Sequence, residues 1–236
     1  MNNSINKLKN SNNSRDNLSL VLWGNILSST TRIRYTKHEL SIVKLPEKVR
    51  SVIVGIILSD GHIALTPRSK NAYLIFSQSL AKLTYVYFVF HFLNHYCQSS
   101  PRLSISNAWG KTTYQLKIST RSMLCITELH KFFYENRIKV IRPSIYFYIT
   151  PIALAHWIMG DGTFTGKSLL LCTDSFSIKE VVLLINVLII KYDLCCIIQY
   201  NTKKYPRIYI RKESMFKLRK IVLPYMHESM LYKLGL

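Results

Sequence analysis

Two apolar segments of similar length each end in an Asp-Gly pair. Residues 47–61 read EKVRSVIVGIILSDG, and residues 150–162 read TPIALAHWIMGDG. Pro46 and Pro151 stand near the two starts, where proline is tolerated. Glycine directly after each aspartate is a favoured residue at a helix C-terminus. The pattern therefore predicts two apolar helices, each of which ends at its Asp-Gly pair.

The same order of elements is expected after each of these helices. Period-two alternation predicts strands and 3.6-residue periodicity predicts helices. In the first copy the strand, helix, hairpin and helix are expected at Tyr73–Gln78, Leu80–Leu93, Leu103–Ser119 and Met123–Tyr134. In the second copy they are expected at Ser168–Thr173, Ser177–Tyr192, Ile197–Arg211 and Ser214–Ile221. The chain is thus predicted to be an α+β protein built from two αββαββα repeats.

The repeats give the expected domain boundaries. The first repeat should span residues 47–140 and the second residues 141–236, after an N-terminal extension at residues 1–46. Residues 1–17 are polar and low in complexity, so they are expected to be disordered. Leu18–Leu27 could form a short helix or strand. A basic stretch at Arg32, Arg34 and Lys37 could contact a polyanion or could simply be solvated.

Helix signals are clearest in the second copy. Ser177 and Glu180 form an S-x-x-E capping box, which marks a helix N-terminus. The expected apolar stripe there comprises Val181, Leu184, Leu188 and Tyr192. The equivalent helix of the first copy follows Ser79, and its expected apolar stripe comprises Leu80, Leu83, Tyr87, Phe90 and Leu93.

The predicted hairpins carry polar side chains on the face that is turned away from the core. Rows of such side chains on an antiparallel sheet are suited to contact base edges in a DNA major groove. A solvated sheet face is the alternative interpretation. The outward set comprises Gln115, Lys117, Arg207, Tyr209 and Arg211.

The charge of the chain favours a polyanionic partner. Lysine and arginine total 32 against 12 acidic residues, which gives a formal net charge of +20. Nucleic acid is the expected partner, while a membrane surface and a ribosomal type of protein are alternatives. No apolar run approaches the roughly 20 residues needed to cross a bilayer. Four further basic residues are expected to contact the phosphate backbone: Arg68, Lys70, Arg102 and Lys111.

Cysteine usage argues against a disulfide framework or a zinc site. The five cysteines are odd in number and form no C-x-x-C pair, so they are expected in the core of a protein from a reducing compartment. Asn, Ile, Lys and Tyr are abundant, and their A/T-rich codons suggest an organellar genome.

Asp60 and Asp161 stand out because acidic residues are scarce. Each lies at a helix C-terminus, where the helix dipole disfavours negative charge. If the two helices pack together, the carboxylates also repel each other. A bound cation would relieve both penalties. The alternative is that Asp-Gly is only a turn signal, but two copies that are 101 residues apart favour a shared site.

The two Asp-Gly helices resemble the motif of the LAGLIDADG endonucleases. Ile53–Gly61 fits the nine-residue pattern well and Leu154–Gly162 less closely, since His156 stands where the pattern has glycine. A packed, neutral histidine is expected there. Phe76–Ser79 and Leu171–Ser177 also resemble the subfamily found in organellar introns, and the resemblance covers residues 47–225.

This resemblance implies a monomer in which the motif helices pack side by side and carry two saddle-like antiparallel sheets. Gly55 and Ser59 should lie on the seam. It also implies site-specific cleavage of double-stranded DNA at a long asymmetric target by a mitochondrial, intron-encoded enzyme. The expected cofactor is Mg²⁺, for which Mn²⁺ or Ca²⁺ could substitute. Asp60 and Asp161 would be the metal ligands, with a backbone group of Gly61 or Gly160.

Other roles follow from the same resemblance. It implies a basic pocket beside the reacting phosphate, for which Lys204 is the candidate and Lys203 the alternative. Gln78 would play a polar part in catalysis. Each of the three is also a candidate DNA contact. Asp174 could cap the helix that follows it.

Two other functions remain open. The chain could be an RNA maturase that assists splicing of its own group I intron without catalysis. It could also be a DNA-binding protein that has lost its activity. Retention of both aspartates favours the nuclease, because splicing assistance requires no metal site.

Overall fold

The computed structural model describes residues 32–66, 70–108, 111–202 and 204–236. The predictions for Leu18–Leu27, Arg68 and Lys203, and the disorder expected at residues 1–17, therefore concern residues outside the described part. Lys111 lies in a described strand, but only its backbone is described.

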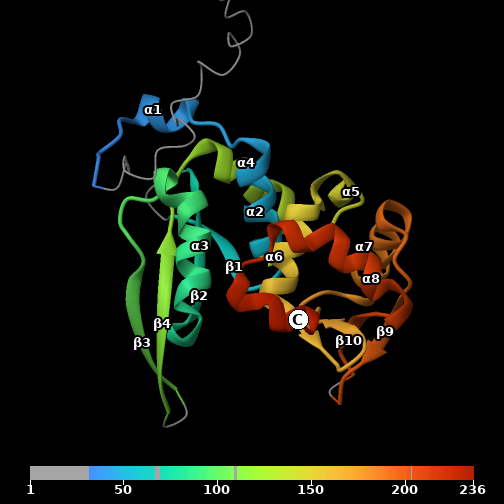
Figure 1. Ribbon diagram of the computed structural model, residues 1–236. Coiled ribbons are helices and arrows are strands. Elements are labelled where there is room, and N and C mark those ends of the chain that lie inside the picture. The colour runs from blue at the N-terminus through green and yellow to red at the C-terminus, as the bar shows by residue number, and fades with distance from the viewer. Residues whose placement is uncertain (1–31, 67–69, 109–110, 203) are drawn as a thin grey trace, which may run out of the picture.

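The chain folds as the two expected repeats (Figure 1). The first repeat consists of α2 (Glu47–Leu58), β1 (Gly61–Leu65), β2 (Ala72–Ser79), α3 (Leu83–Leu93), β3 (Arg102–Ala108), β4 (Lys111–Ser119) and α4 (Leu124–Phe133). The second consists of α6 (Pro151–Asp161), β7 (Gly162–Phe164), β8 (Leu169–Leu171), α7 (Ile178–Tyr192), β9 (Cys196–Tyr200), β10 (Pro206–Ile210) and α8 (Met215–Val222). Both follow the order αββαββα, so the predicted α+β fold is confirmed.

Shorter elements join or extend the repeats. Within the described residues they are α1 (Lys37–Ile42), η1 (Leu80–Lys82), η2 (Asn94–Tyr96), β5 (Tyr134–Glu135), β6 (Ile138–Lys139), α5 (Ile145–Tyr148), η3 (Lys212–Ser214), η4 (Leu223–Tyr225) and η5 (Glu228–Leu234). The β5–β6 hairpin and α5 connect the two repeats. The 3₁₀ segments η4 and η5 bring the C-terminal end of the chain back against α6.

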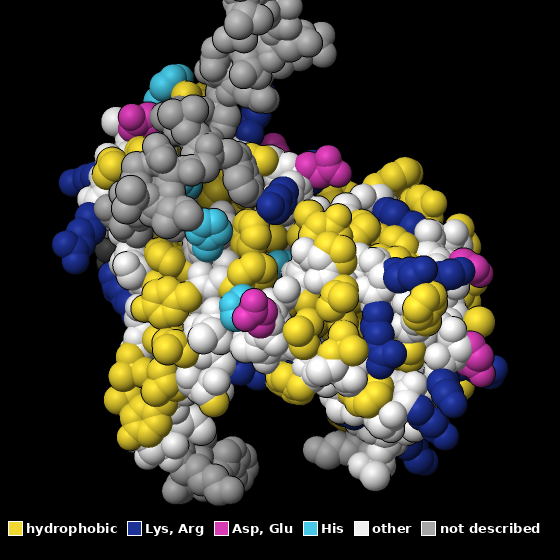
Figure 2. Space-filling model, in the orientation of Figure 1, with side chains coloured by type: hydrophobic (Ala, Val, Ile, Leu, Met, Phe, Trp, Pro, Cys, Tyr) yellow, Lys and Arg dark blue, Asp and Glu magenta, His cyan; other side chains and the backbone are white. Residues whose placement is uncertain are grey.

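The two sheets have the same topology. Their strand orders are β1-β2-β4-β3 and β7-β8-β10-β9, and all neighbouring strands are antiparallel. Gly61 pairs with Phe76 in the first sheet, as Gly162 pairs with Leu171 in the second. This shared register makes residues of the two halves directly comparable. The two lobes flank a hollow on the lower side of Figure 2.

The motif helices α2 and α6 pack in almost direct backbone contact. A Cβ added to Gly55 would overlap the carbonyl oxygen of Ala153 and lie 2.6 Å from Cβ of His156. A Cβ added to Gly160 would overlap the side chain of Ser59. Gly55 and Ser59 therefore both face α6, as predicted. Small residues on each helix give the other helix room to approach.

His156 is buried at this seam, as expected of a packed histidine. Its ring stacks on Phe88, with centroids 5.7 Å apart, and its Nδ1 lies 3.4 Å from the Tyr85 hydroxyl. The side chain is 0% exposed, and burial lowers its pKa to about 3. His156 is thus neutral at physiological pH and fills space at the seam.

This burial makes stability depend on pH. In the unfolded chain His156 takes up a proton near pH 6.5, whereas the folded pKa is about 3. The contribution of the neutral ring is complete above pH 6.5 and is lost as pH falls toward 3. His156→Gln keeps a polar group of similar size that does not titrate. Between pH 7 and about pH 4.5, its free energy of unfolding in urea should therefore fall by about 2–3 kcal/mol less than that of the wild type. The exposed control His38→Gln should follow the wild type, and a His156→Gln curve parallel to both would contradict this assignment.

The glycines after the two aspartates have a different role from the one predicted. Neither adopts a left-handed cap, since Gly61 begins β1 and Gly162 has φ −70° and ψ 145°. A Cβ on Gly61 would instead overlap Ile56, and one on Gly162 would lie 2.6 Å from the carbonyl oxygen of Ile158. These glycines let the chain turn tightly back over the helix that it has just left.

The face predicted for α3 is partly wrong. Leu80, Leu83 and Tyr87 are exposed, and within α3 the buried residues are Tyr85, Val86, Val89 and Leu93. The sequence LTYVYFVFHFL is apolar on every side, so its periodicity selects no face. The stripe of α7 is confirmed at Val181, Leu184 and Leu188, and the Ser177–Glu180 capping box forms.

The cysteines are free, as expected, and Cys97, Cys125 and Cys196 lie in the core. Cys172 is half-buried and Cys195 is exposed, so the core assignment holds for three of the five. In the described part of the chain, no helix combines the length and apolar character of a bilayer-spanning segment.

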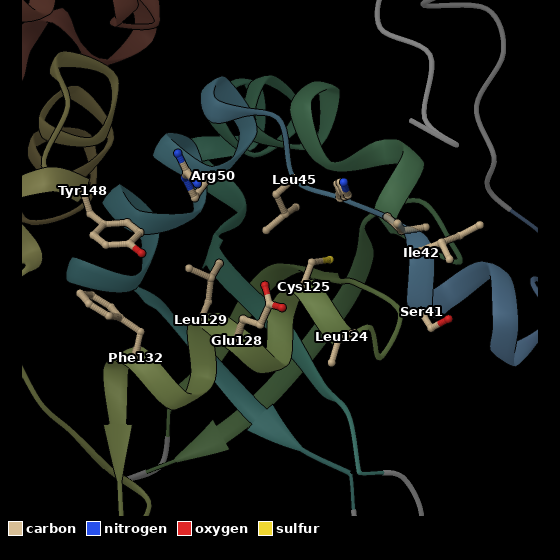
Figure 3. Close-up of a pocket in the computed structure, with 12 residues that line it drawn as sticks. Ser41, Ile42, Leu45, Arg50, Leu124, Cys125, Glu128, Leu129, Phe132 and Tyr148 are labelled. Carbon is tan, nitrogen blue, oxygen red and sulfur yellow. The ribbon is translucent and has the colours of Figure 1, made fainter. Parts of the chain in front are cut away.

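The described part of the N-terminal extension is held against the first repeat. Arg121 donates to the Ile33 carbonyl oxygen at 2.8 Å, and the Tyr96 hydroxyl donates to that of Lys44 at 3.2 Å. Between this segment and α4 lies a cavity of about 700 Å³, lined by Leu45, Glu128 and other residues (Figure 3). Residues 33–44 therefore contribute to the surface of the first lobe.

Candidate active site

Packing of the motif helices brings the two aspartates to one place. Asp60 follows the C-terminal end of α2, and Asp161 is the last residue of α6. A Cβ on Gly160, the neighbour of Asp161, would lie 3.0 Å from Oδ2 of Asp60. The carboxylate of the first half thus lies against the last turn of the second motif helix. The structure brings together the two residues that the sequence singled out.

The surroundings of the two carboxyls disfavour their charged forms. The pKa of Asp161 rises to about 7, chiefly because burial desolvates the carboxyl and secondly because Asp60 carries a like charge. The pKa of Asp60 is also raised by desolvation. Asp60 as a residue is exposed and Asp161 is half-buried, so neither residue is closed off from solvent. Neighbouring cations lower both pKa values and partly offset these effects.

Those cations are Lys82, Lys139 and Lys233, which the sequence analysis did not identify. Lys139 donates to the carbonyl oxygens of Ile57 at 2.6 Å and Gly61 at 3.3 Å. Lys233 donates to the carbonyl oxygen of Gly160 at 3.0 Å. Desolvation lowers the pKa of both ammonium groups, while the charges of Asp60 and Asp161 raise it. The site therefore combines two carboxylates with lysines that are held at the ends of the two motif helices.

Lys139 and Lys233 occupy comparable positions in the two halves. Lys139 ends β6, which follows α4, and Lys233 lies in η5, which follows α8 and η4. Each lysine returns to the motif helix of its own half in the folded chain, and no local pattern in the sequence marks either residue. Neither lies in an element that the sequence predicted.

Lys204 is not brought to the carboxylates. It is exposed in the turn between β9 and β10, with φ +61°, and its backbone N–H donates to the Asn201 carbonyl oxygen at 2.9 Å. Among the described residues, the cations that act on both aspartates are the three lysines above. The position of Lys204 at a hairpin tip suits a phosphate contact, and the lysines that act on the two carboxyls are Lys82, Lys139 and Lys233.

Gln78 makes the two halves unequal. It is buried, and its side-chain amide donates to Oδ2 of Asp60. By register, the equivalent residue in the second half is Thr173, two positions after Leu171. Thr173 instead donates to the Pro206 carbonyl oxygen at 2.7 Å. Asp60 is thus held by an amide that has no counterpart at the equivalent position beside Asp161.

The donor set fits a hard divalent cation that brings its own water. Mg²⁺ prefers oxygen ligands and keeps several waters, so one or two carboxylates are sufficient when substrate phosphates complete the shell. Among the described residues no group of three or more His, Cys, Asp or Glu side chains forms a closed cage. The carbonyl oxygens of Gly61 and Gly160 each accept a hydrogen bond from a lysine. The carboxylates are therefore the stronger candidates for ligands.

The predicted outward residues occupy several different environments. Arg102 and Lys117 are exposed and lie opposite each other on β3 and β4, with Gln115 half-buried two residues before Lys117. Lys70 is exposed in a loop before β2. Tyr209 is half-buried, and its hydroxyl donates to Ser168 at 2.8 Å. Arg211 is exposed, as predicted, and lies one residue beyond the end of β10.

Asp174 does not cap α7, since Ser177 does. Its carboxylate accepts two hydrogen bonds from Arg207, each 2.7 Å long. Arg207, predicted to face outward, is therefore half-buried in an ion pair on the surface of the second sheet.

Comparison with known proteins agrees with this geometry. A family model described as the LAGLIDADG DNA endonuclease family matches residues 50–218. The solved structure of the homing endonuclease I-WcaI bound to its DNA recognition sequence superposes with a TM-score of 0.77. That structure is 31% identical in sequence, and the match covers 81% of this chain and 88% of that one.

Two curated relatives match most of the chain. A probable intron-encoded endonuclease 1 of Wickerhamomyces canadensis is 32% identical over 85% of this chain and 88% of its own length. The cytochrome b mRNA maturase bI2 of Saccharomyces cerevisiae is 35% identical over 83% of this chain. The match covers 49% of the maturase, so the chain spans about half the length of that relative.

Proposed function

The chain belongs to the LAGLIDADG DNA endonuclease family, and from this premise we propose that it is a site-specific double-strand DNA endonuclease that acts as a monomer. The observation that carries the proposal is the meeting of Asp60 and Asp161 at the packed ends of α2 and α6. Each half of the chain contributes one carboxylate, as cleavage of two strands requires. The two halves carry different side chains on their sheets, so the target is asymmetric.

Each residue at the site has a separate proposed role. Asp60 and Asp161 would hold Mg²⁺, which lowers the pKa of a bound water and neutralises charge on the phosphate when it is bound. Lys139 and Lys233 supply positive charge beside the reacting phosphates. Gln78 orients the carboxylate of Asp60. Arg102, Lys117 and Gln115 are proposed to contact DNA from the first sheet. Lys70 is proposed to do so from the loop before β2, and Lys204 from the tip of the second hairpin.

A cleavage assay tests this proposal directly. The full chain is incubated with a plasmid library that carries randomised inserts, in buffer with Mg²⁺, Mn²⁺ or Ca²⁺ or with EDTA. Linear plasmids enriched for one insert sequence are expected with Mg²⁺, and none with EDTA. Undigested plasmid under every metal condition, at protein concentrations that retard the DNA on a gel, would leave only a binding function.

The basic pocket gives a second prediction. Lys139→Met and Lys233→Met remove a charge beside Asp60 and Asp161 but keep the length of the side chain. We expect each variant to cleave about 100-fold more slowly, because positive groups aimed at developing charge contribute strongly to the rate. Lys204→Met is the matched control and should weaken binding only slightly. Single-turnover cleavage rates measure the effect. If Lys204→Met slowed cleavage more than Lys139→Met and Lys233→Met, the basic pocket would lie in the hairpin turn and this assignment would be wrong.

Maturase activity is a second candidate function, because relatives with that name match most of the chain. The same positive surfaces could hold folded intron RNA through its backbone. Asp60→Asn should leave such an activity intact, since RNA binding does not need the carboxylate pair. Splicing of the RNA of the host intron with Asp60→Asn and wild-type protein separates the two functions.

We infer that the chain is encoded by an organellar intron. The Wickerhamomyces relative is named intron-encoded, and the Saccharomyces relative is named for cytochrome b mRNA. Together with the A/T-rich codon usage that the composition implies, these names support a mitochondrial location.

A further inference from the structure

Asp174 and Arg207 form a planar ion pair on the second sheet that the cleavage chemistry does not use. Nε of Arg207 donates to Oδ1 of Asp174, and Nη2 donates to Oδ2, both at 2.7 Å. The Arg207 and Asp174 side chains are 24% and 35% exposed. A two-point bond of this kind fixes the plane of the guanidinium as well as its position.

The bond uses one edge of the guanidinium and leaves another available. Asp174 occupies the edge formed by Nε and Nη2. The edge formed by Nη1 and the second proton of Nη2 is bonded to no group among the described residues. Two parallel N–H donors in one plane match the O6 and N7 acceptors of guanine in the major groove. The pair thus presents a rigid two-donor edge at the surface.

The neighbours of Asp174 hold it in turn. Asn201 donates to Oδ2 of Asp174 at 3.2 Å, and Oδ1 of Asn201 accepts from the backbone N–H of Tyr205 at 2.9 Å. The ion pair is therefore tied to the β9–β10 turn. Arg207 alternates along β10 with the buried Ile208 and Ile210, so its guanidinium lies on the face of the second sheet that is turned away from the core.

The first half lacks this arrangement. By register, Lys117 is the counterpart of Arg207 and Ser79 is the counterpart of Asp174. Lysine is a flexible point charge, and serine cannot fix it. A carboxylate on a DNA-facing surface is unfavourable unless it is compensated, so its presence in one half alone indicates a role specific to that half.

We propose that Asp174 is a positioning residue that commits Arg207 to recognise one guanine in the second half of the DNA target. This inference rests on the proposed function, because it requires that the second sheet lies in a major groove. Without Asp174, the guanidinium could rotate and contact a phosphate or another base. Discrimination at one base pair would then fall, while affinity for DNA in general would not.

Sequencing of selected sites tests the proposal. A randomised duplex library is selected twice with the full chain, once for binding without divalent metal and once for cleavage with Mg²⁺. The wild type should enrich guanine strongly at one position of one half-site. Asp174→Asn should reduce that preference about tenfold and leave the other positions unchanged, given that one bidentate contact discriminates by roughly 5- to 150-fold. Arg207→Lys should reduce preference at the same position.

The matched control is Asp193→Asn, which makes the same substitution and the same change of charge. Asp193 pairs with Lys217 of α8 at the C-terminal end of α7, and asparagine tolerates its left-handed backbone. Its base profile should equal that of the wild type, and thermal melting of all variants monitors folding. The proposal would be overturned if Asp174→Asn weakened base preference equally at every position of the target. It would also be overturned if Asp174→Asn and Arg207→Lys both kept the guanine preference of the wild type. A wild type that selects a sequence but cuts none would overturn the proposed cleavage and would leave this inference measurable by binding.

Discussion

Asp161→Asn is expected to abolish double-strand cleavage while the protein still binds its DNA target. The asparagine keeps the shape of the side chain but removes a metal-ligating charge from the meeting point of α2 and α6. We expect the rate to fall by roughly a thousandfold or more, which corresponds to about 4 kcal/mol of barrier. Asp60→Asn should behave in the same way, because each half supplies one carboxylate.

Affinity should be nearly unchanged or slightly higher, since removal of an acidic group lessens repulsion of phosphate. Gel retardation without metal measures binding, and plasmid cleavage with Mg²⁺ measures the rate. Asp193→Asn, with the same chemical change on an exposed helix end, should cut like the wild type. Normal cutting of both strands by either active-site variant would show that the paired carboxylates are not the metal ligands.

Gly55→Ala is expected to destabilise the whole protein, although alanine favours helices. The added methyl would overlap the Ala153 carbonyl oxygen and lie 2.6 Å from Cβ of His156, so the helices must move apart. Overpacking of a core typically costs about 1–3 kcal/mol. Because the opposing atoms are backbone, which moves less readily than a side chain, we expect the free energy of unfolding to fall by about 3 kcal/mol.

Urea unfolding followed by circular dichroism measures this loss. Gly166→Ala is the comparison, because Gly166 has φ +84° and an added Cβ there meets nothing within 4 Å. That variant should lose only about 1 kcal/mol through backbone strain. Equal losses in the two variants would mean that the seam can open at little cost.

The elements that local patterns specify were predicted correctly from the sequence. The two motif helices, the strands expected at Tyr73–Gln78 and Ser168–Thr173 and the capping box at Ser177 depend on residues close together in the chain, and all are present. The short strands β1 and β7, which begin at the glycines after the two aspartates, were not located from the sequence. The helix α3 was located but its face was not, because its apolar residues surround it. Repetition mattered most, since it placed Asp60 and Asp161 in one site.

The residues of the proposed basic pocket could not be predicted because their meeting depends on the path of the chain in space. Lys139 and Lys233 reach the motif helices from segments that follow each repeat, and no local pattern marks those segments. Lys204 was suggested by its place in a hairpin turn, but it is not among the cations that act on the two carboxyls. Likewise, Asp174 had no visible partner in the sequence, because Arg207 is 33 residues away.

The complementary shapes of Gly55 and His156 constrain how this protein can exchange parts with its relatives. The histidine occupies space that exists only because the opposite helix carries no side chain at that level. A hybrid that joined this second half to a first half with any larger residue at the position of Gly55 would force two side chains into one volume. Recombination or engineered exchange of protein halves should therefore succeed only when Gly55 and His156 are inherited together.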